Sequence, residues 1–438
     1  MIKKNFKVLI FCIFFSIFLS NIFLLSTNLP VQDDWNNIYL LNKFDGNIIK
    51  FFLIQDNNHF IFFSRILFFL NDYYLNLNFK ITDYISFVLL IFLFFKIYNL
   101  IKIKNNYYFL ILVSLLFSGR LFPLITQSFN IVWILSFLLL VFFIEAYNKS
   151  NERISYKVLF LILCNILNFG LHIVIPIFLT IYLIIKENKK INIIYLLFYF
   201  LIFYTTYFLS EKFVGDYNSI TSSVINLKLL IIKFDFLPFF FTLFSNLSSI
   251  YFPIIKSFAP VSFVIGFIQV CLIIILFIKN NKLKKKSIIK FLNENYLITL
   301  GILASTQIAF FRIFDSMEVR FSIISIIFQI GFWNYFFHEI KKRFLLRYLS
   351  IFVSFVLFVT GYFSPYLGTY WQTVRYNKTL AIKECLKKNT IETKKCDDLI
   401  YFYVFNNGNW FDKSKFNIVI SELRKEKKVF FNEKYINH

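Results

Sequence analysis

Two adjacent carboxylates, Asp33 and Asp34, follow the first apolar run of the chain, and Trp35 comes directly after them. Carboxylates at a membrane surface can act as a general base, hold a divalent cation, or mark the start of a helix. We expect both side chains to be solvated and ionised, so that they can face a substrate. The sequence therefore makes Asp33 and Asp34 candidate catalytic residues and candidate metal ligands.

His59 and Arg65 lie farther along the same polar stretch, which covers residues 27–79. The spacing of apolar residues predicts a helix from about residue 58 to residue 71, lying on the membrane surface with one broad apolar face. Six positions separate the two side chains, so they point in different directions around such a helix. We therefore do not expect them to contact one substrate atom together.

Three further charged residues, Arg312, Glu318 and Arg320, lie in the short connection FRIFDSMEVRF between two apolar runs. Arginine suits a phosphate because its planar guanidinium donates two parallel charged hydrogen bonds. A salt bridge between Glu318 and either arginine is the alternative, because charges near hydrocarbon need compensation. Arg120 and His172 stand in two other short connections. A lone histidine is more often a structural hydrogen-bonding group than a catalyst.

The composition indicates what must position these residues. Of the 438 residues, 58% are hydrophobic and 16% are charged, and the mean hydropathy is +0.66. Apolar runs of about 20 residues, the length that crosses the hydrocarbon core of a bilayer, recur along the chain. We expect an all-α polytopic membrane protein whose surroundings are lipid. Its many Phe, Ile, Asn and Lys residues are typical of an AT-rich genome and suggest a bacterial source.

The formal net charge of +23 comes from Lys and Arg residues that fall largely in short clusters between apolar runs. Such clusters are retained in the cytoplasm and set the orientation of a membrane protein, so we expect no nucleic-acid partner. Basic connections alternate with less basic ones, which places the N-terminus in the cytoplasm, residues 27–79 outside and the C-terminus outside, in a bacterial inner membrane. The expected spans are about 8–26, 81–101, 107–118, 130–147, 156–168, 171–185, 192–209, 258–278, 296–311, 321–338 and 346–363.

Two other segments do not fit the pattern of spans. Residues 227–252 are apolar but interrupted by Lys233, Asp235 and Pro238, so we expect them to lie in the interface or to re-enter the membrane. Residues 364–438 have the composition of a soluble protein and predict a small extracytoplasmic domain, α/β or mainly helical, beside a transmembrane domain of residues 1–363. Within it, Cys385 and Cys396 can form a disulfide, which would contribute about 2 to 4 kcal/mol.

The arrangement resembles the GT-C superfamily of integral-membrane glycosyltransferases, which includes protein O-mannosyltransferases and aminoarabinose transferases. The likeness lies in a cytoplasmic N-terminus, about eleven spans and a long first outer loop that opens with the Asp-Asp-Trp element. It is similar to bacterial members with an N-E-H-R element in that loop and a later arginine that opens a span. Here Asn57-Asn58-His59-Phe60 and Glu318-Val319-Arg320-Phe321 occupy those places. The Glu and Arg of the N-E-H-R element are replaced, which leaves His59 alone.

The resemblance implies inverting transfer of a sugar from a polyprenyl-phosphate donor to a glycan, lipid or protein acceptor on the outer face. Asp33 or Asp34 would be the catalytic base, with Trp35 and His59 beside the substrate. The phosphate would be held by Arg320, assisted by Arg65 or Arg312, next to Glu318. A divalent cation on the two aspartates is compatible with this scheme but not required.

Other function classes remain open at the level of sequence. A polymerase or ligase of polyprenyl-linked glycans also has many spans, but residues 210–251 lack the arginines that would favour it. A lipid or solute transporter would place ionisable residues inside its spans, and these are nearly free of charge. An inactive GT-C-like scaffold would account for the altered N-E-H-R element. Patterns for nucleotide, flavin or zinc-protease chemistry do not occur in the sequence.

Overall fold

The computed structural model is helical through nearly all of the residues that it describes, and its one isolated β-bridge joins Ile61 to Asn168. A helical protein with long apolar segments is what the sequence predicts. The described residues are 2–30, 33–44, 47–55, 59–103, 105–126, 130–150, 153–168, 170–185, 189–214, 236–252, 256–280, 285–311, 321–340, 343–363, 368–388, 394–405 and 412–431.

A helix is found at each of the expected spans. Seven stretches of described helix are long and apolar enough to cross a bilayer, and three further apolar helices are shorter. The chain is therefore an all-α protein with several helices suited to a membrane. These ten stretches lie at α1 (Ile2–Leu25), α5 (Phe79–Ile101), α6 (Asn106–Leu116), α8 (Ile131–Lys149), α9 (Tyr156–Ile166), α10 (Val174–Ile185), α11 (Lys189–Val214), α14 (Ala259–Asn280), α16 (Tyr296–Phe311) and α18 (Arg343–Tyr362). The remaining expected span is occupied by α17 (Ser322–Glu339), which is not one of these ten.

The outer faces of the bundle are apolar as well as its core. Leu197, Leu201 and Phe208 on α11 are exposed, as are Phe352 and Phe355 on α18. A soluble protein rarely exposes large apolar side chains along whole helices, because contact with water is unfavourable. These faces therefore fit contact with lipid.

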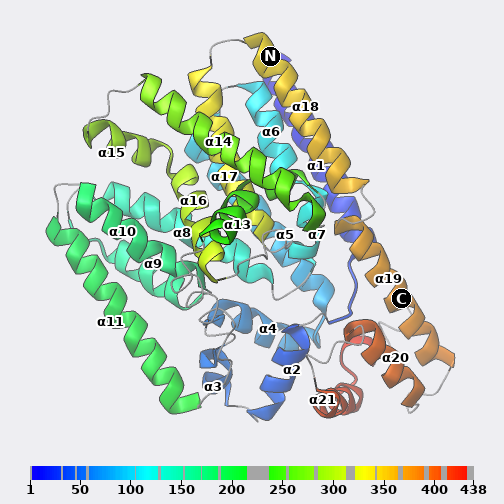
Figure 1. Cartoon of the computed structure of the whole chain (residues 1–438). Helices are drawn as coiled ribbons and strands as arrows, with labels where there is room; N and C mark the ends of the chain where they lie inside the picture. Colours follow the sequence, from blue (N-terminus) through cyan, green and yellow to red (C-terminus); the bar gives the residue numbers. More distant parts are fainter. Residues whose placement is uncertain are drawn as a thin grey trace.

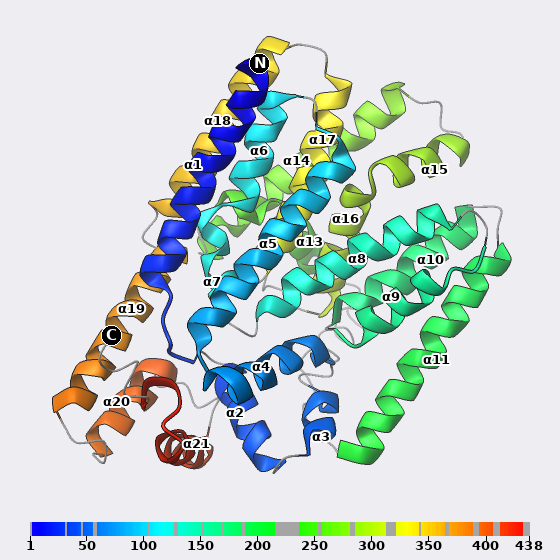
Figure 2. The ribbon, with the colours of Figure 1, turned by 180° about the vertical axis from the view of Figure 1, so that it is seen from behind.

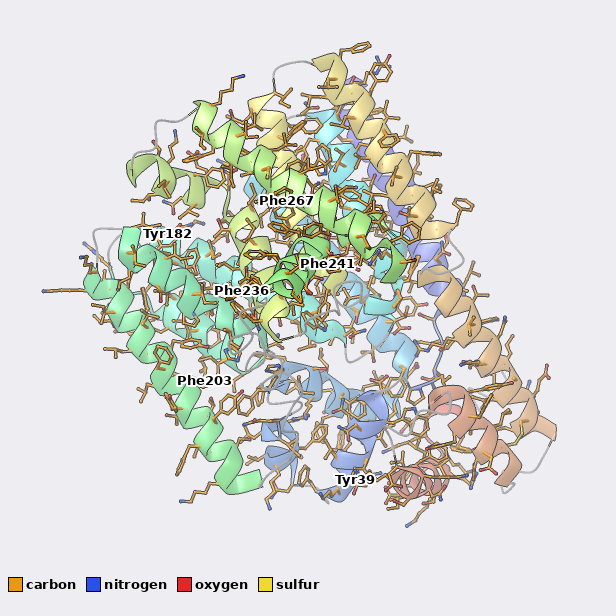
Figure 3. All side chains as sticks on the ribbon, viewed as in Figure 1. Tyr39, Tyr182, Phe203, Phe236, Phe241 and Phe267 are labelled. Atoms are coloured by element: carbon orange, nitrogen blue, oxygen red, sulfur yellow. A yellow bond between two sulfur atoms is a disulfide. The ribbon has the colours of Figure 1, made fainter. Side chains whose placement is uncertain are left out.

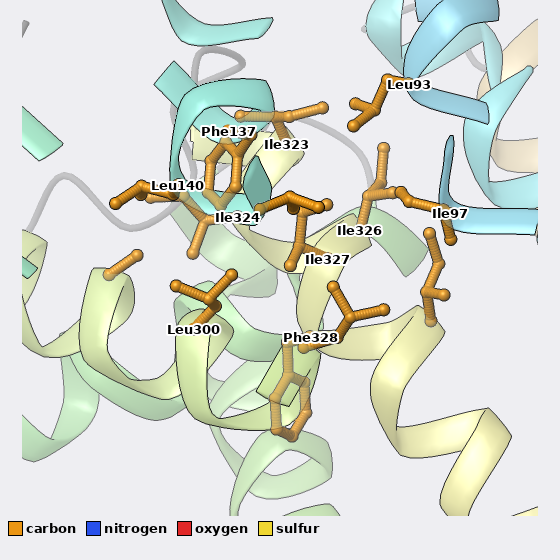
Figure 4. Packing of buried hydrophobic residues seen from close by; sticks show 14 of the residues in the cluster. Leu93, Ile97, Phe137, Leu140, Leu300, Ile323, Ile324, Ile326, Ile327 and Phe328 are labelled. Carbon is orange, nitrogen blue, oxygen red and sulfur yellow. The ribbon is translucent and has the colours of Figure 1, made fainter. Parts of the chain in front are cut away.

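The centre of the bundle is α17, which is buried along most of its length. Figure 4 shows Ile324 and Ile327 of α17 among apolar side chains from neighbouring helices, including Leu140 of α8 and Leu300 of α16. Gly301 allows this approach, because a Cβ there would lie 2.5 Å from the Cβ of Phe328. The core thus joins helices from both halves of the sequence.

Beyond α6 the chain continues through buried residues instead of forming a surface loop. It makes a 3-10 turn, η1 (Gly119–Leu121), and the short helix α7 (Phe122–Ile125), and all these residues are buried. At Gly119 a Cβ would lie 2.1 Å from the carbonyl oxygen of Gly361, so this connection passes against the end of α18 where only glycine fits. The hydroxyl of Tyr362 donates to the carbonyl of Phe117 over 2.7 Å and fastens the same contact.

Of the stretch expected in the interface or re-entering, residues 237–248 form α13 (Leu237–Ser248), which packs against α14, α16 and α17. Its Ser248 Oγ lies 2.8 Å from Ser262 Oγ on α14. Aromatic rings also join the two helices: Phe241 contacts Phe263, and Phe244 contacts Phe267. Phe241 and Phe267 are labelled in Figure 3. A helix inserted among others fits the structure better than one lying flat in the interface.

The first polar stretch and the C-terminal segment form one layer at the end of the bundle away from the N-terminus (Figures 1 and 2). We call it the cap layer. Its apolar side chains, including Trp35, Phe51, Phe68, Ile382 and Phe416, make one shared core, so the C-terminal segment is not packed as a separate unit. Cys385 and Cys396 form a disulfide within it. Its helices are α2 (Asp33–Lys43), α3 (Ile48–Leu53), α4 (Phe62–Leu75), α19 (Gly368–Lys388), α20 (Lys394–Phe405) and α21 (Lys413–Lys425).

Candidate functional site

The turn that follows α1 is tied to the start of α5 by two hydrogen bonds. Ser26 Oγ donates to Oδ2 of Asp83 over 2.7 Å. The backbone amide of Phe79 donates to Oδ1 of Asn28 over 2.7 Å. All four residues are buried. Because this turn leads directly into the Asp-Asp-Trp element, these bonds fix where α2 begins.

Asp34 and Trp35 are enclosed by the cap layer. Asp34 is 1% exposed and Trp35 is fully buried, so the expectation of a solvated carboxylate is wrong for Asp34. The physical reason is the C-terminal segment: the Trp35 ring lies 5.3 Å from that of Phe416 on α21, and its Nε1 donates to the carbonyl of Pro30 over 3.0 Å. Asp33 is the first residue of α2, and its side chain lies outside the described part of the structure.

A buried arginine of the C-terminal segment faces the same place. Arg375 on α19 donates from its two terminal nitrogens to the backbone carbonyls of Thr126 and Leu29. Burial lowers the pKa of Arg375, and the negative charges of Asp83 and Asp34 oppose that shift. Asp34, Asp83 and Arg375 therefore form a buried cluster of charges, contributed by α2, α5 and α19.

The cluster contains two carboxylates and one guanidinium, and this limits what it can bind. In the part of the chain that the structure describes, no group of three or more His, Cys, Asp or Glu residues is arranged to hold a metal ion. Arg375 supplies a positive charge that acts on both Asp34 and Asp83. The positive charge of Arg375 can compensate a carboxylate of this cluster, and an ionised carboxylate can act as a general base.

Arg120 lies in η1, within the buried connection between α6 and α8, and is 1% exposed. Its Nε donates to Oγ of Ser322 over 2.9 Å. Its two terminal nitrogens are also buried, and among the described residues neither has a hydrogen-bond partner. Two such nitrogens on one guanidinium can donate together to a single carboxylate or phosphate, in a bidentate contact.

His59 lies between the cap layer and the bundle. Its ring fills the space beside Gly170, where a Cβ would lie 2.7 Å from Cε1. Gln307 of α16 donates to the carbonyl of Gly170 over 2.5 Å. Nearby, His172 is also buried, and its Nδ1 lies 2.8 Å from the hydroxyl of Tyr199. The structure thus places His59 against the connection between α9 and α10.

The helix expected at residues 58–71 begins four residues later. α4 starts at Phe62, and Ile61 before it has a non-helical backbone. Ile61 forms an antiparallel bridge with Asn168, and the amide of Phe62 donates to the carbonyl of Leu167 over 3.0 Å. Because these residues pair with another segment, they cannot form the first turn of a helix. Phe60 and Ile61 are buried instead of facing lipid.

Arg65 is fully buried in α4 rather than on a surface. It donates to the carbonyl of Ile54, which follows α3, and its guanidinium carbon lies 5.6 Å from the centre of the Phe51 ring. These contacts fasten α4 to α3. They favour a structural role for Arg65 over the phosphate-binding role that the sequence suggested.

The remaining candidates, Arg312, Glu318 and Arg320, lie outside the described residues. Their chain neighbour Ser322, two residues after Arg320, accepts the hydrogen bond from Arg120. The described part of the structure therefore brings Arg120 to the beginning of α17, where this segment joins the bundle.

Sequence reasoning did not assign a role to Asp83, Arg120 or Arg375. Asp83 stands near the start of an apolar run, where it looks like an ordinary helix-start residue, and Arg375 stands among many charged residues of the C-terminal segment. Arg120 offered the best signal, since it is the one charged residue between residues 105 and 144. A charge in so apolar a stretch needs a partner or a function.

Neither protein-family models nor curated proteins nor solved structures match the chain. The resemblance to the GT-C superfamily therefore rests on the few motif residues and the arrangement of apolar runs. What the chain does must be argued from its own side chains.

Proposed function

We propose that the chain is a membrane glycosyltransferase that moves a sugar from a polyprenyl-phosphate donor to a glycan, lipid or protein acceptor on the outer face of a bacterial inner membrane. In this proposal eleven helices cross the membrane, the N-terminus is cytoplasmic and the cap layer is extracytoplasmic. The observation that carries the proposal is Arg120, whose terminal nitrogens are buried and lack an acceptor among the described residues.

A buried guanidinium is costly unless an anion compensates it, and the penalty is several kcal/mol. A phosphate is suited to that role, because its oxygens match the spacing of the two terminal nitrogens. Arg120 lies within a largely apolar bundle, so a phosphate that carries a lipid chain could reach it from the membrane side. Both nitrogens are closed off from solvent, so the phosphate must enter through a movement of the elements around them.

The proposed reaction uses Arg120 and the buried cluster of Asp34, Asp83 and Arg375. Arg375 contacts the carbonyl of Thr126, which ends the connection that carries Arg120. Asp34 takes the proton from the hydroxyl group of the acceptor molecule. The oxygen of that hydroxyl group bonds to the anomeric carbon of the sugar. The bond from that carbon to the phosphate oxygen breaks, and the phosphate leaves with the electron pair. Arg120 stabilises the negative charge on the leaving phosphate.

A transporter is the principal alternative of a different class, and the polar groups inside the bundle bear on it. Lys96 of α5 and Glu145 of α8 form an ion pair of 2.5 Å near the ends of their helices. Deeper in the bundle, Gln269 and Gln329 exchange amide hydrogen bonds of 2.9 and 2.7 Å, and the hydroxyl of Tyr251 donates to Gln329 over 2.6 Å. Groups that satisfy one another in this way fit a structural role better than an ion pathway.

Transfer can be tested with purified protein in liposomes that contain radiolabelled polyprenyl-phosphate sugars and a cell-envelope acceptor extract. We expect transfer from at least one donor and a loss of about 100-fold or more in Asp34→Asn and in Arg120→Gln. Asp398→Asn, an exposed aspartate of the same cap layer paired with Lys413, is the matched control and keeps full activity.

Undiminished transfer in Asp34→Asn would refute the assignment of the base. Transfer from none of the donors would refute the glycosyltransferase itself. Products with many added sugars would instead identify a polymerase.

The proposed orientation has its own test. Tyr74 on α4 is 70% exposed and the side chain of Lys290, on α15 (Lys285–Glu294), is 71% exposed, so the two positions are equally accessible in the folded protein. A membrane-impermeant maleimide added to intact cells should label Tyr74→Cys and not Lys290→Cys. The reverse result would overturn the orientation.

A further inference from the structure

Asn246, near the end of α13, is fully buried inside the bundle. Neither its Nδ2 nor its Oδ1 has a hydrogen-bond partner among the described residues. Neighbouring hydroxyls of the same helix do have partners: Ser245 and the carbonyl of Ala259 are 3.1 Å from Nδ2-free oxygen contacts of no other kind, since Ser245 Oγ donates to that carbonyl, and Ser248 Oγ donates to the carbonyl of Ser262 over 2.5 Å. A buried amide without hydrogen bonds is unfavourable, because its lost contacts with water are not replaced. The amide of Asn246 is therefore left for a partner from outside the described chain.

The side of α13 that carries Asn246 is turned toward α16. Asn246 repeats the helical spacing of Phe239 and Leu243, which places all three side chains on one face of the helix. The centre of the Phe239 ring lies 4.5 Å from that of Phe310 on α16, and Leu243 belongs to the same apolar cluster as Ala309. Asn246 thus continues a face that packs on α16.

A second buried polar atom without a partner lies on α16 itself. The Oγ of Ser305 is fully buried and has no hydrogen-bond partner among the residues that the structure describes. α16 and α17 run in opposite directions, because Gly331 lies against Ile298 and Gly301 lies against Phe328. One turn farther along α16, Ser305 is therefore at the level of the first turns of α17.

Those first turns of α17 join Asn246 to the site of Arg120. Ser325 Oγ donates over 3.0 Å to the carbonyl of Leu247, the residue after Asn246. Ser322, one turn earlier on the same helix, accepts the hydrogen bond from Arg120 over 2.9 Å. Three residues of helix rise by about 4.5 Å. The end of α13 and the guanidinium of Arg120 therefore meet α17 about one turn apart.

We infer that Asn246 and Ser305 form a subsite for the sugar of the lipid-linked donor, in which their side chains bind sugar hydroxyls beside the phosphate held by Arg120. This inference rests on the proposed function, in which Arg120 holds that phosphate. A sugar hydroxyl both donates and accepts hydrogen bonds, and the amide and the hydroxyl of these two side chains do the same. Both side chains are neutral, so they suit a neutral hydroxylated ring and not a second anion.

A buried water molecule bonded to the same polar atoms is the alternative, because such molecules commonly satisfy buried groups in proteins. The two explanations differ in what a variant does to ligand binding. Leucine branches at the same carbon as asparagine and has no polar atom, so Asn246→Leu removes every hydrogen bond of this side chain. With a water molecule as the partner, the affinity for the donor would not change. With a sugar as the partner, it must fall.

The test follows thermal unfolding in detergent while the protein is titrated with polyprenyl phosphate, or with the same lipid carrying glucose, galactose, mannose or arabinose. We expect at least one sugar-bearing lipid to bind wild type at least about 10-fold more tightly than polyprenyl phosphate does, which corresponds to about one hydrogen bond. Asn246→Leu should bind polyprenyl phosphate as wild type does and lose this advantage. Ser305→Ala should lose part of it, and this smaller change decides the question if Asn246→Leu does not fold.

Asn165→Leu is the matched control. Asn165 is also a buried asparagine, but its Nδ2 donates to the carbonyl of Leu161 within α9 over 2.8 Å. This variant should keep the whole advantage of the sugar-bearing lipid. Deoxy forms of the preferred sugar then identify the hydroxyl that is bound: its removal should weaken binding to wild type and make no difference to Asn246→Leu.

The outcomes separate this inference from the proposed function. An equal advantage of the sugar in wild type, Asn246→Leu and Ser305→Ala would overturn the subsite and leave water as the partner. If polyprenyl phosphate binds wild type and no sugar improves the binding, the subsite is refuted while the phosphate site at Arg120 stands. If the expected pattern appears but no sugar is transferred, the transferase fails and the subsite stands as a glycolipid-binding site. If none of the lipids binds wild type, both proposals fail.

Discussion

Replacement of Arg120 by methionine would separate the stability of the protein from its capacity to bind a phosphate. Methionine has a similar length and no charge, so it removes the cost of burying a guanidinium whose terminal nitrogens lack an acceptor among the described residues. The variant also loses the 2.9 Å hydrogen bond to Ser322. The two effects oppose each other, and their sizes decide whether Arg120→Met is more or less stable than wild type.

Apolar replacement of buried ion pairs is often neutral or stabilises a protein by about 1 to 4 kcal/mol, and we take the upper part of that range for this guanidinium. The lost hydrogen bond costs about 1 kcal/mol. We therefore expect Arg120→Met to be more stable than wild type by up to about 3 kcal/mol when no ligand is present. At about 2 °C per kcal/mol, the scale expected for a long chain, its midpoint would rise by up to about 6 °C.

The assay is thermal unfolding in detergent, followed by the loss of monodisperse protein, with and without a polyprenyl phosphate. A ligand at 100 times its dissociation constant stabilises the folded state by about 2.7 kcal/mol. Wild type should gain that amount and Arg120→Met should gain nothing. The control is Ser322→Ala, which keeps the charge and removes its hydrogen bond, and it should be less stable than wild type.

A lower midpoint for Arg120→Met without ligand would refute this reasoning. It would mean that the guanidinium already has a partner that contributes more than its burial costs. The assignment of Arg120 to a phosphate would then fall, whatever the effect of the variant on transfer.

Three further variants test how the cap layer is held together. Trp35→Ala should lower the free energy of unfolding by about 3 to 5 kcal/mol, because it leaves a cavity in a fully buried site against Phe416. Limited proteolysis should then cut the C-terminal segment faster, and unchanged cleavage would contradict the shared core. Cys385→Ser should lower the free energy of unfolding by about 3 kcal/mol, as expected for a disulfide between residues 11 positions apart. A reductant should cause the same loss in wild type and no further loss in the variant. Gly170→Ala should destabilise the protein by about 1 to 3 kcal/mol, because the new Cβ would lie 2.7 Å from the His59 ring; His59→Ala should relieve that penalty in the double variant.

The apolar helices could be predicted from the sequence because length and hydropathy alone decide them. α5, expected at residues 81–101, covers Phe79–Ile101, and α8, expected at 130–147, covers Ile131–Lys149. α4 begins later than the sequence predicts because Ile61 and Phe62 pair with Asn168 and Leu167, a contact that local periodicity does not contain. Tertiary pairing overrode the local preference.

Only part of the charged cluster of Asp34, Asp83 and Arg375 could be predicted from neighbouring residues in the sequence. Asp34 was a candidate from its own neighbourhood, but its burial depends on α21. Arg375 is more than 300 residues from Asp34 in sequence, and no local pattern indicates that the two act on each other. Arg120 could have been found, since a lone charge in an apolar stretch is a signal that sequence alone supplies.

The shared core of the cap layer has a consequence for how the protein is made. Trp35 is among the first residues synthesised, and Phe416, which covers it, follows about 380 residues later. At about 5 to 20 residues per second, the ribosome needs roughly 20 to 80 s to supply that cover. During this interval the first loop exposes tryptophan and phenylalanine side chains that a chaperone must shield or a protease can find. A chain that stops before α21 would never bury them, so loss of the last few dozen residues should be as damaging as loss of a span.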